Sequence, residues 1–329
     1  MSAPTLQVEG LSTHFITRDG VAKAVDDVSF SIGRGEVLGL VGESGSGKSM
    51  TGYSLLGMVD APGKIVAGRV LLTPRDGRTI DLRTLDERAL RRLRGDRIAM
   101  IFQDPMMTLN PVLSIETQMV ETLRAHRDIS HADARARSRD MLARVGIPAP
   151  DERLGAYPHQ FSGGMRQRVA IAIALLNEPD LIIADEPTTA LDVTLQGQIL
   201  AEMEVLCAET GLALLWITHD LSVVAGLADR VAVMYAGRIV EQGPVADVID
   251  DPRHPYTAGL IASAPSRNRR GVPLAQIAGA TPSLLKLPAG CAFNPRCAHA
   301  RDDCRAVAPV PTVVDAREWR CFHPVGASA

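Results

Sequence analysis

Residues 42–49 read Gly-Glu-Ser-Gly-Ser-Gly-Lys-Ser, which is the G-x-x-x-x-G-K-S pattern of a phosphate-binding loop. A short apolar strand pattern at residues 37–41 precedes the loop, and a helical pattern at 49–58 follows it. Glycines in such a loop let backbone N–H groups converge on phosphate oxygens, and the next helix adds its positive dipole end. The sequence therefore predicts a nucleotide site on an α/β fold. The residues expected there are Gly42, Glu43, Ser44, Gly45, Ser46, Gly47, Lys48 and Ser49.

A second apolar strand pattern, residues 181–184, ends in the acids Asp185 and Glu186. In a parallel sheet the carboxyl ends of strands share one edge, where nucleotides bind. We expect Lys48 at the β- and γ-phosphates, and Ser49 and Asp185 at Mg²⁺. Glu186 is then placed to activate the attacking water as general base. A solvated acidic pair opening a turn is the alternative, and the phosphate-binding loop makes the catalytic interpretation the better one.

Two polar residues follow other strand patterns, and each would be unremarkable alone. Gln103 comes after residues 97–102 and precedes a helical stretch, so we expect it to contact Mg²⁺ or water. His219 comes after residues 212–218, and its expected contact is the γ-phosphate. Both interpretations rest on the order of these residues within the larger set.

Another segment, Ser162-Gly163-Gly164, precedes a helical pattern with an apolar face. Ser162 is a natural N-cap, and the glycines expose further N–H donors. The segment predicts a second anion-binding helix terminus. A well-capped helix without a ligand is the alternative from these residues alone.

Composition narrows the function classes. The chain has 329 residues, 46% of them hydrophobic and 22% charged, which is ordinary for a globular protein with a sizeable core. The net charge of −3 gives no indication of a nucleic-acid-coating surface. The longest wholly apolar run is residues 169–176, far below the roughly 20 residues that span a bilayer, and no signal peptide is recognised. We therefore expect a soluble, cytoplasmic protein.

The pattern along the chain predicts its organisation. Residues 6–15 and 25–32 alternate like antiparallel strands, and strands alternate with helices from 181 to 235, as in a mostly parallel sheet covered on both faces. Residues 105–160 read as a helical insertion. Prolines multiply and periodicity is lost after about residue 242. The expected division is an α/β domain over 1–250 and a small, loop-rich, cysteine-containing domain over 251–329.

Four of the five cysteines fall in the last 39 residues: Cys291, Cys297, Cys304 and Cys321. Structural zinc sites more often show two close C-x2–4-C pairs. The wider spacing here suits a loop wrapped around a larger object, such as a cubane iron–sulfur cluster with one cysteine at each corner. Zinc and free or disulfide-linked thiols are the alternatives, although a reducing cytosol disfavours disulfides.

Taken in order, these segments resemble the ATP-binding subunit of an ABC transporter over about residues 5–245. The resemblance implies a P-loop fold, with ATP closing a head-to-tail pair in which the Ser162–Gly164 segment of one subunit meets the loop of the other. It also implies that Asp192, in Ala190-Leu-Asp192, lies at the dimer interface and that Phe15 stacks on adenine, where the family often uses Tyr. The signature has Phe161 and Met165 in place of the commoner Leu and Gln, which leaves its serine and glycines intact.

A narrower resemblance is to the oligopeptide/dipeptide importer ATPases. It rests on the signature Phe161–Arg168, on His254-Pro-Tyr-Thr257 and on the tail Cys291-Ala-Phe-Asn-Pro-Arg-Cys297, and it extends the match through nearly the whole chain. It implies peptides as cargo, with nickel, glutathione or oligosaccharides as alternatives. It further implies a partner ATPase, two membrane permeases and an external binding protein, at the cytoplasmic face of the membrane. Some members of that family hold [4Fe–4S] in the tail.

Two other function classes stay open at this level. A soluble ABC ATPase acting on DNA or ribosomes is disfavoured by the acidic balance and by the absence of a long coiled-coil insertion. In the third class, a redox or metal sensor, the cysteine tail is the functional part and ATP binding is regulatory.

Overall fold

The computed structural model describes residues 3–188, 193–264 and 275–326. These form two compact units that interleave along the chain. Unit 1 comprises the chain start to Leu6, Ile32–Glu36 and Leu72–Leu215, and unit 2 comprises Gln7–Ser31, Val37–Leu71 and Trp216 to the chain end.

Unit 1 is built on a parallel strand pair. Strand β6 (Ile98–Ile101) pairs with β7 (Leu181–Asp185), with Ile101 opposite Ala184. The side chains of β7 are buried along its whole length, as expected of a strand covered on both faces. The other elements of unit 1 are β5 (Ile80–Asp81), α2 (Glu87–Leu93), α3 (Ile115–Arg124), α4 (His131–Arg144), α5 (Pro150–Leu154), α6 (Gly163–Leu175) and α7 (Val193–Thr210).

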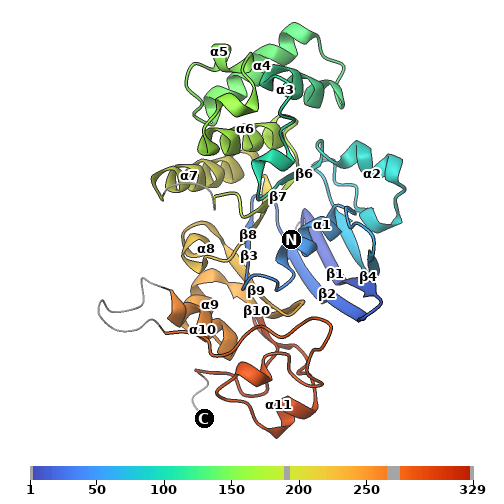
Figure 1. Cartoon of the computed structure of the whole chain (residues 1–329), viewed down its shortest axis with the longest axis vertical. Helices are drawn as coiled ribbons and strands as arrows, with labels where there is room; N and C mark the ends of the chain where they lie inside the picture. Colours follow the sequence, from blue (N-terminus) through green and yellow to red (C-terminus); the bar gives the residue numbers. More distant parts are fainter. Residues whose placement is uncertain (1–2, 189–192, 265–274, 327–329) are drawn as a thin grey trace. The chain divides into compact units, whose positions relative to one another are not determined.

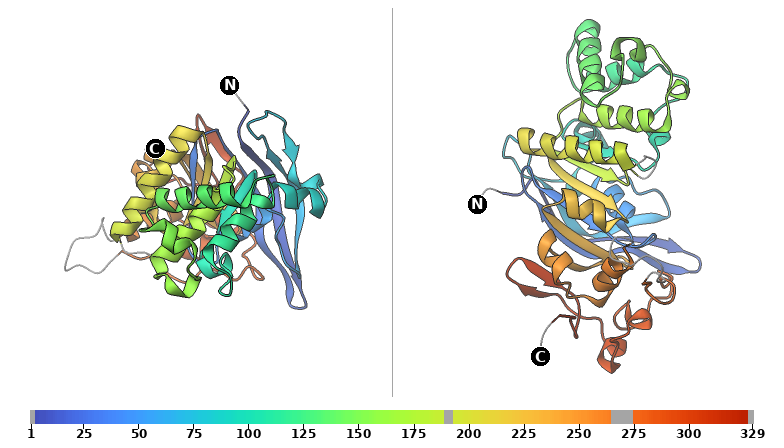
Figure 2. Two further views of the ribbon diagram at one scale, coloured as in Figure 1. Left: turned by 90° about the horizontal axis from the view of Figure 1, so that it is seen from above. Right: turned by 90° about the vertical axis from the view of Figure 1, so that its left-hand side faces the viewer.

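Helices occupy much of residues 105–160, where the sequence predicted a helical insertion. Helices α3, α4 and α5 lie in it, and they gather with α6 in one group (green in Figures 1 and 2). Serine N-caps begin α3 and α4: the Ser114 and Ser130 hydroxyls accept hydrogen bonds from the N–H groups of Thr117 and Asp133.

Unit 2 contains an antiparallel sheet and a second set of strands. In the antiparallel sheet β1 (Leu6–Thr17) lies between β2 (Gly20–Ile32) and β4 (Gly63–Leu72), as Figure 1 shows in blue. Sequence alternation predicted β1 and β2 but not β4. In the second set, β3 (Val37–Val41) pairs in parallel with β9 (Arg230–Tyr235), and β10 (Arg238–Pro244) follows β9 antiparallel.

The C-terminal residues extend this set of strands. Strand β12 (Arg317–Trp319) pairs antiparallel with β10, and β11 (Thr312–Val314) pairs with β12. Residues after 242 therefore carry more regular structure than the lost periodicity indicates, because the elements are too short to show a period. The boundary near residue 250 stays a prediction. The helices of unit 2 are α1 (Lys48–Leu55), α8 (Leu221–Leu227), α9 (Val245–Asp250), α10 (Pro255–Ser263) and α11 (Asp302–Ala306), and β8 (Ala213–Thr218) runs from unit 1 into unit 2.

One close approach inside unit 2 explains a glycine in a buried strand. A Cβ on Gly39 of β3 would lie 2.4 Å from the Val224 side chain of α8. The backbone of β3 at Gly39 therefore packs directly against the Val224 side chain of α8. This contact fixes the position at which the loop after β3 starts.

Candidate nucleotide site and cysteine cavity

The predicted phosphate-binding loop connects β3 to α1 with a tightly packed backbone. Gly45 and Gly47 have φ values of 78° and 106°, a region that favours glycine. A Cβ on Gly42 would lie 2.2 Å from the Met234 carbonyl oxygen, and one on Gly47 would lie 2.2 Å from the Ala24 carbonyl oxygen. Packing against neighbouring strands therefore demands glycine at both positions, and the backbone is held as a cradle.

Polar groups inside the loop fit a bound anion. The Lys48 ammonium donates to the carbonyl oxygens of Gly42 (2.7 Å) and Glu43 (3.1 Å), so its charge lies over the loop backbone. Ser46 is fully buried, and its hydroxyl has no hydrogen-bond partner among the residues that the structure describes. The Ser46 backbone is fixed by the Gly237 N–H, which donates to its carbonyl (2.9 Å). A buried hydroxyl and a buried cation in a glycine cradle suit phosphate oxygens.

Glu43, the second residue of the loop, is held by the C-terminal part of the chain. Its carboxylate accepts two hydrogen bonds from Arg296 (2.6 and 2.9 Å) and one from Thr281 (3.0 Å). Its backbone N–H donates to the Tyr256 hydroxyl (2.8 Å). The Arg296 guanidinium holds the pKa of the Glu43 carboxyl below its usual range. Sequence reasoning missed these partners, although Tyr256 and Arg296 lie inside two segments that carried the family resemblance.

At the carboxyl edge of the β6–β7 pair, the structure brings two predicted residues together. Ile101 of β6 pairs with Ala184 of β7, and Gln103 and Glu186 each lie two residues further along the chain. The Gln103 amide donates a hydrogen bond to the Glu186 carboxylate (3.1 Å). Asp185, the last residue of β7, is buried. Glu186 has a φ of 45°, an uncommon value for a residue with a side chain and one often found at functional sites.

The signature segment begins α6 at the protein surface. The Ser162 hydroxyl accepts a hydrogen bond from the Met165 N–H (3.3 Å), so Ser162 is the predicted N-cap. Ser162 and Gly163 are exposed, and a Cβ on Gly163 would meet no atom within 4 Å. Gly164 is half-buried. The first N–H groups of α6 therefore face open space.

The remaining predicted site residues that the structure describes lie on or next to different elements. Phe15 is half-buried on β1, where its ring lies beside Gly63 at the start of β4. His219 is exposed directly after β8. Ser49 is half-buried in the first turn of α1. Asp192 lies outside the described residues.

Comparison with known proteins places these features in a family. A family model described as "ABC transporter" matches residues 25–189, and one described as "Oligopeptide/dipeptide transporter, C-terminal region" matches residues 240–304. A putative peptide import ATP-binding protein of Brucella abortus is 50% identical over 328 residues, covering 97% of each chain. The oligopeptide transport ATP-binding protein OppD of Escherichia coli is 47% identical and covers 97% of this chain and 93% of OppD. The chain belongs to the ABC transporter family.

Solved structures agree with this assignment. The ATP-binding cassette MJ0796, in a dimeric post-hydrolysis state bound to ADP and Pi, matches with a TM-score of 0.65 and 27% identity over 73% of this chain and 98% of that one. The P-loop fold expected from the sequence is therefore confirmed. The family match and the structural match together show that this ABC subunit is an ATP-hydrolysing enzyme. Among the described residues, no helix combines the length and the apolar character that crossing a membrane requires.

The four C-terminal cysteines of this ABC subunit line one cavity. Cys291, Cys297, Cys304 and Cys321 all contribute to its wall, beside the fully buried His254. The Cys291 N–H donates to the Cys304 carbonyl (2.8 Å), which joins the backbone at two of the four cysteines of residues 291–321, called the cysteine segment below. Burial raises the pKa of the Cys291 and Cys297 thiols, and it raises the pKa of Cys321 to about 12. Without a metal these three thiols stay protonated at neutral pH.

The positions of possible ligand atoms show which residues of this region lie close enough to share one metal ion. Among the described residues, only Asp303, Cys304 and His323 form a group whose ligand atoms all lie within 4.8 Å of one another. No three of the cysteine sulfurs meet that limit. Tetrahedral zinc, with Zn–S bonds of about 2.3 Å, needs sulfurs roughly 3.8 Å apart. Among the described residues, the four cysteines therefore do not form a tetrahedral zinc site as they stand, whereas Cys304 belongs to the group with Asp303 and His323.

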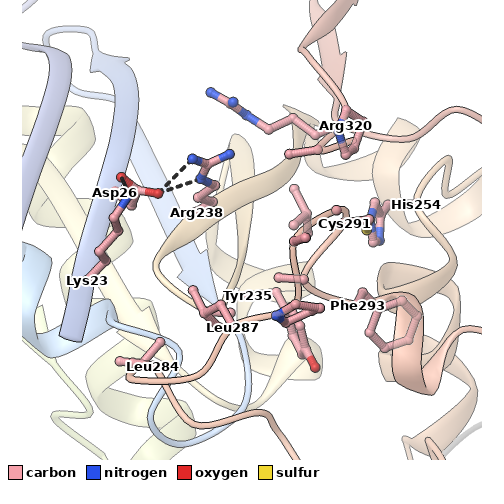
Figure 3. Close-up of a pocket in the computed structure, with 18 of the residues that line it drawn as sticks. Lys23, Asp26, Tyr235, Arg238, His254, Leu284, Leu287, Cys291, Phe293 and Arg320 are labelled. Carbon is pink, nitrogen blue, oxygen red and sulfur yellow. Dashed lines mark hydrogen bonds and ion pairs between the residues drawn. The ribbon is translucent and has the colours of Figure 1, made fainter. Parts of the chain in front are cut away.

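A larger cavity of about 310 Å³ lies next to the same segment (Figure 3). Its wall includes Tyr235, Leu287, Cys291 and Phe293. The Arg238 guanidinium on this wall is paired with Asp26 at 2.7 Å. Lys23 and Arg320 also line this cavity.

Proposed function

We propose that this chain is the ATPase subunit of a peptide importer, in which ATP-driven closure of a pair of subunits energises membrane permeases. The observation that carries the proposal is the glycine cradle of residues 42–49, with its buried Lys48 and Ser46, in a chain of this family. Peptide as cargo is supported by the relatives, which are named for peptide, oligopeptide and dipeptide transport. Nickel, glutathione or oligosaccharides are the alternative cargoes.

ATP and Mg²⁺ fit the residues present. Lys48 would bind the phosphates together with the backbone N–H groups of Gly42–Ser49, and the buried Ser46 hydroxyl suits a phosphate oxygen. Ser49, Gln103 and Asp185 would hold Mg²⁺. The ion would neutralise charge that develops on the transferred phosphoryl group.

Glu186 is the proposed general base. The hydrogen bond from Gln103 orients the Glu186 carboxylate, and the left-handed backbone at Glu186 turns the chain immediately after β7. Gln103 in turn precedes the helical insertion, so a shift of that insertion would change how the base is held. His219 is proposed to contact the γ-phosphate from the end of β8.

The second half of the nucleotide site is proposed to come from another subunit. The exposed N-terminus of α6, at Ser162–Gly164, offers N–H donors and a positive dipole end to a γ-phosphate. Asp192 is proposed at the same interface, and Phe15 is proposed to stack on adenine. The partner is proposed to be a second, different ABC ATPase, which gives a heterodimer.

The permease contact is proposed at the start of the helical insertion. Met106, Met107 and Val112 follow Gln103 and are exposed apolar side chains. Such a group of side chains suits docking of a permease helix, and it places the contact next to the residue that orients the base. Two permeases and an external substrate-binding protein complete the proposed importer, with this subunit peripheral at the cytoplasmic face and without a nucleic-acid partner.

A [4Fe–4S] cluster is the proposed occupant of the cysteine cavity. Four cysteines that line one cavity, without three sulfurs gathered within 4.8 Å of one another, suit a cubane with one thiolate at each corner. Because the thiols of Cys291, Cys297 and Cys321 are held protonated by burial, loading would release protons. Iron, sulfide and zinc analysis of anaerobically purified protein tests this, with Cys291→Ser expected to lower iron. Unchanged iron in that variant, or zinc in place of iron, would contradict the cluster.

Reconstitution tests the transport function. The subunit is purified with the products of its neighbouring genes and placed in liposomes with the external binding protein. Peptide should stimulate ATP hydrolysis and should accumulate inside the vesicles. Stimulation by nickel, glutathione or an oligosaccharide instead would replace peptide as cargo. Isolation without permeases, or with ribosomes or DNA, would contradict the importer assignment.

A further inference from the structure

Glu43 places a carboxylate inside a loop that must bind a highly charged anion. The carboxyl group lies within the electrostatic reach of Lys48, which together with Arg296 contributes to keeping its pKa low. An ionised carboxylate at this position would repel phosphate unless another group cancels its charge. A cation that pairs with the Glu43 carboxylate would remove this repulsion.

Arg296 supplies a positive charge to Glu43, and several hydrogen bonds fix the position of its guanidinium. Its side chain is only 5% exposed, and its two terminal nitrogens bind the two carboxylate oxygens of Glu43 at 2.6 and 2.9 Å. Bidentate pairing of this kind fixes direction as well as charge, which a lysine does not. The remaining donor, Nε, binds the Ala278 carbonyl (3.0 Å). The guanidinium thus has little freedom to move away from the loop.

Two aromatic rings lie next to each other beside the guanidinium. Its central carbon lies 5.8 Å from the Tyr235 ring centroid and 5.9 Å from that of Phe293, both visible in Figure 3. Phe293 packs edge-on against Tyr235 (5.2 Å) and tilted against Tyr256 (5.4 Å), the residue whose hydroxyl accepts the Glu43 N–H. One cluster therefore fixes both the side chain and the backbone of Glu43.

We propose that Arg296 is a positioning residue for ATP binding: it cancels the charge of Glu43 and holds the phosphate-binding loop in the conformation that accepts phosphate. The proposal rests on the nucleotide site proposed above. It assigns to the C-terminal segment a direct part in the ATP site of the same chain. Arg296 itself does not touch the nucleotide.

The test measures affinity of the full chain for MgATP and for adenosine. Arg296→Ala should weaken MgATP binding about tenfold, the size expected for one unit charge at roughly 10 Å and an effective dielectric constant of about 20. Adenosine, which carries no phosphate, should lose much less affinity. The double variant Glu43→Gln/Arg296→Ala should recover most of the MgATP affinity, because the uncompensated charge is gone. Arg296→Lys should fall between wild type and Arg296→Ala, because the charge remains without the bidentate geometry.

The matched control is Arg301→Ala, which removes an exposed positive charge from the same segment and should leave MgATP affinity unchanged. Equal affinity in wild type and Arg296→Ala would overturn the proposal, and so would equal losses for MgATP and adenosine. Failure of the double variant to improve on Arg296→Ala would overturn the charge argument even if the single variant is poorly folded. If wild-type protein itself does not bind MgATP, the proposed nucleotide site fails instead, and the two failures are distinguishable.

Discussion

Glu186 combines three features that a structural acid does not need together: a left-handed backbone, a position directly after a buried strand, and a hydrogen bond from Gln103. We expect Glu186→Gln to bind MgATP as wild type does but to lower kcat by about 10²–10⁴, the range of a general base. Removal of the base should also trap the closed pair, observable as an ATP-dependent dimer on size exclusion. Hydrolysis at the wild-type rate by Glu186→Gln would show that another group is the base.

His254 gives a residue-scale prediction for stability. It is fully buried, burial lowers its pKa to about 3, and its Nδ1 accepts the Tyr256 N–H (3.0 Å) at the start of α10. The unfolded chain binds a proton near the ordinary pKa of about 6.5 and the folded chain does not, so this contribution to stability is present above pH 6.5 and is lost as the pH falls toward 3. The slope reaches at most about 1.4 kcal/mol per pH unit.

Denaturant unfolding between pH 7 and pH 4.5 measures that slope. His254→Asn keeps a side-chain acceptor for the Tyr256 N–H but removes the titration, so its free energy of unfolding should fall less steeply with decreasing pH. His159→Asn, which replaces an exposed histidine, is the comparison for a change of composition alone. An identical slope in His254→Asn and wild type would contradict the assignment.

At the scale of elements, the exposed start of α6 can be tested apart from folding. Gly163→Glu places a carboxylate where the N–H groups face open space, and its Cβ meets no atom. A negative charge in the first turn favours the helix, so stability should not fall. Repulsion of phosphate should lower ATPase activity at least tenfold while MgATP binding to the single chain persists.

Gly197→Glu is the matched control for this element, because Gly197 is also exposed and open on helix α7. Its ATPase activity and thermal midpoint should equal those of wild type. Loss of MgATP binding by Gly163→Glu in the single chain would show that the α6 terminus acts within one subunit and not across a pair.

Elements also show what the sequence could and could not predict. Gly42–Ser49 and the acids after β7 were recognisable because strand, loop and helix signals are local. The Gln103–Glu186 contact was not predicted, because it depends on which strands pair, and the structure pairs β6 with β7. The Glu43–Arg296 pair joins residues 253 positions apart, and no local pattern encodes it. Strands β11 and β12 have three residues each, too few to show alternation.

At the scale of the whole molecule, Arg296 joins the cysteine segment to the phosphate-binding loop inside unit 2 by direct hydrogen bonds to Glu43. Arg296 immediately precedes Cys297, and the Asn294 side chain donates to the Cys291 carbonyl (2.7 Å), which closes the turn that carries Arg296. Loss of the cysteine-bound group should loosen that turn and so free the guanidinium from Glu43. Through this connection, a change of redox state or metal content at the cysteines would alter ATP binding. The protein could then respond to such a change and still be an importer subunit.

The consequence is that the occupancy of the cysteine site should set ATP affinity. Protein reconstituted with iron and sulfide should bind MgATP several-fold more tightly than metal-free protein, measured by equilibrium binding in excess Mg²⁺. In Glu43→Gln/Arg296→Ala the two preparations should bind alike, because the connection has been removed, whereas Arg301→Ala should respond as wild type. If metal-free wild type binds MgATP as well as the reconstituted protein does, the cysteine site stabilises only its own segment. A response that persists in the double variant would mean that the cysteine segment acts on the loop by a route other than Arg296, such as the Tyr256 hydroxyl that accepts the Glu43 N–H.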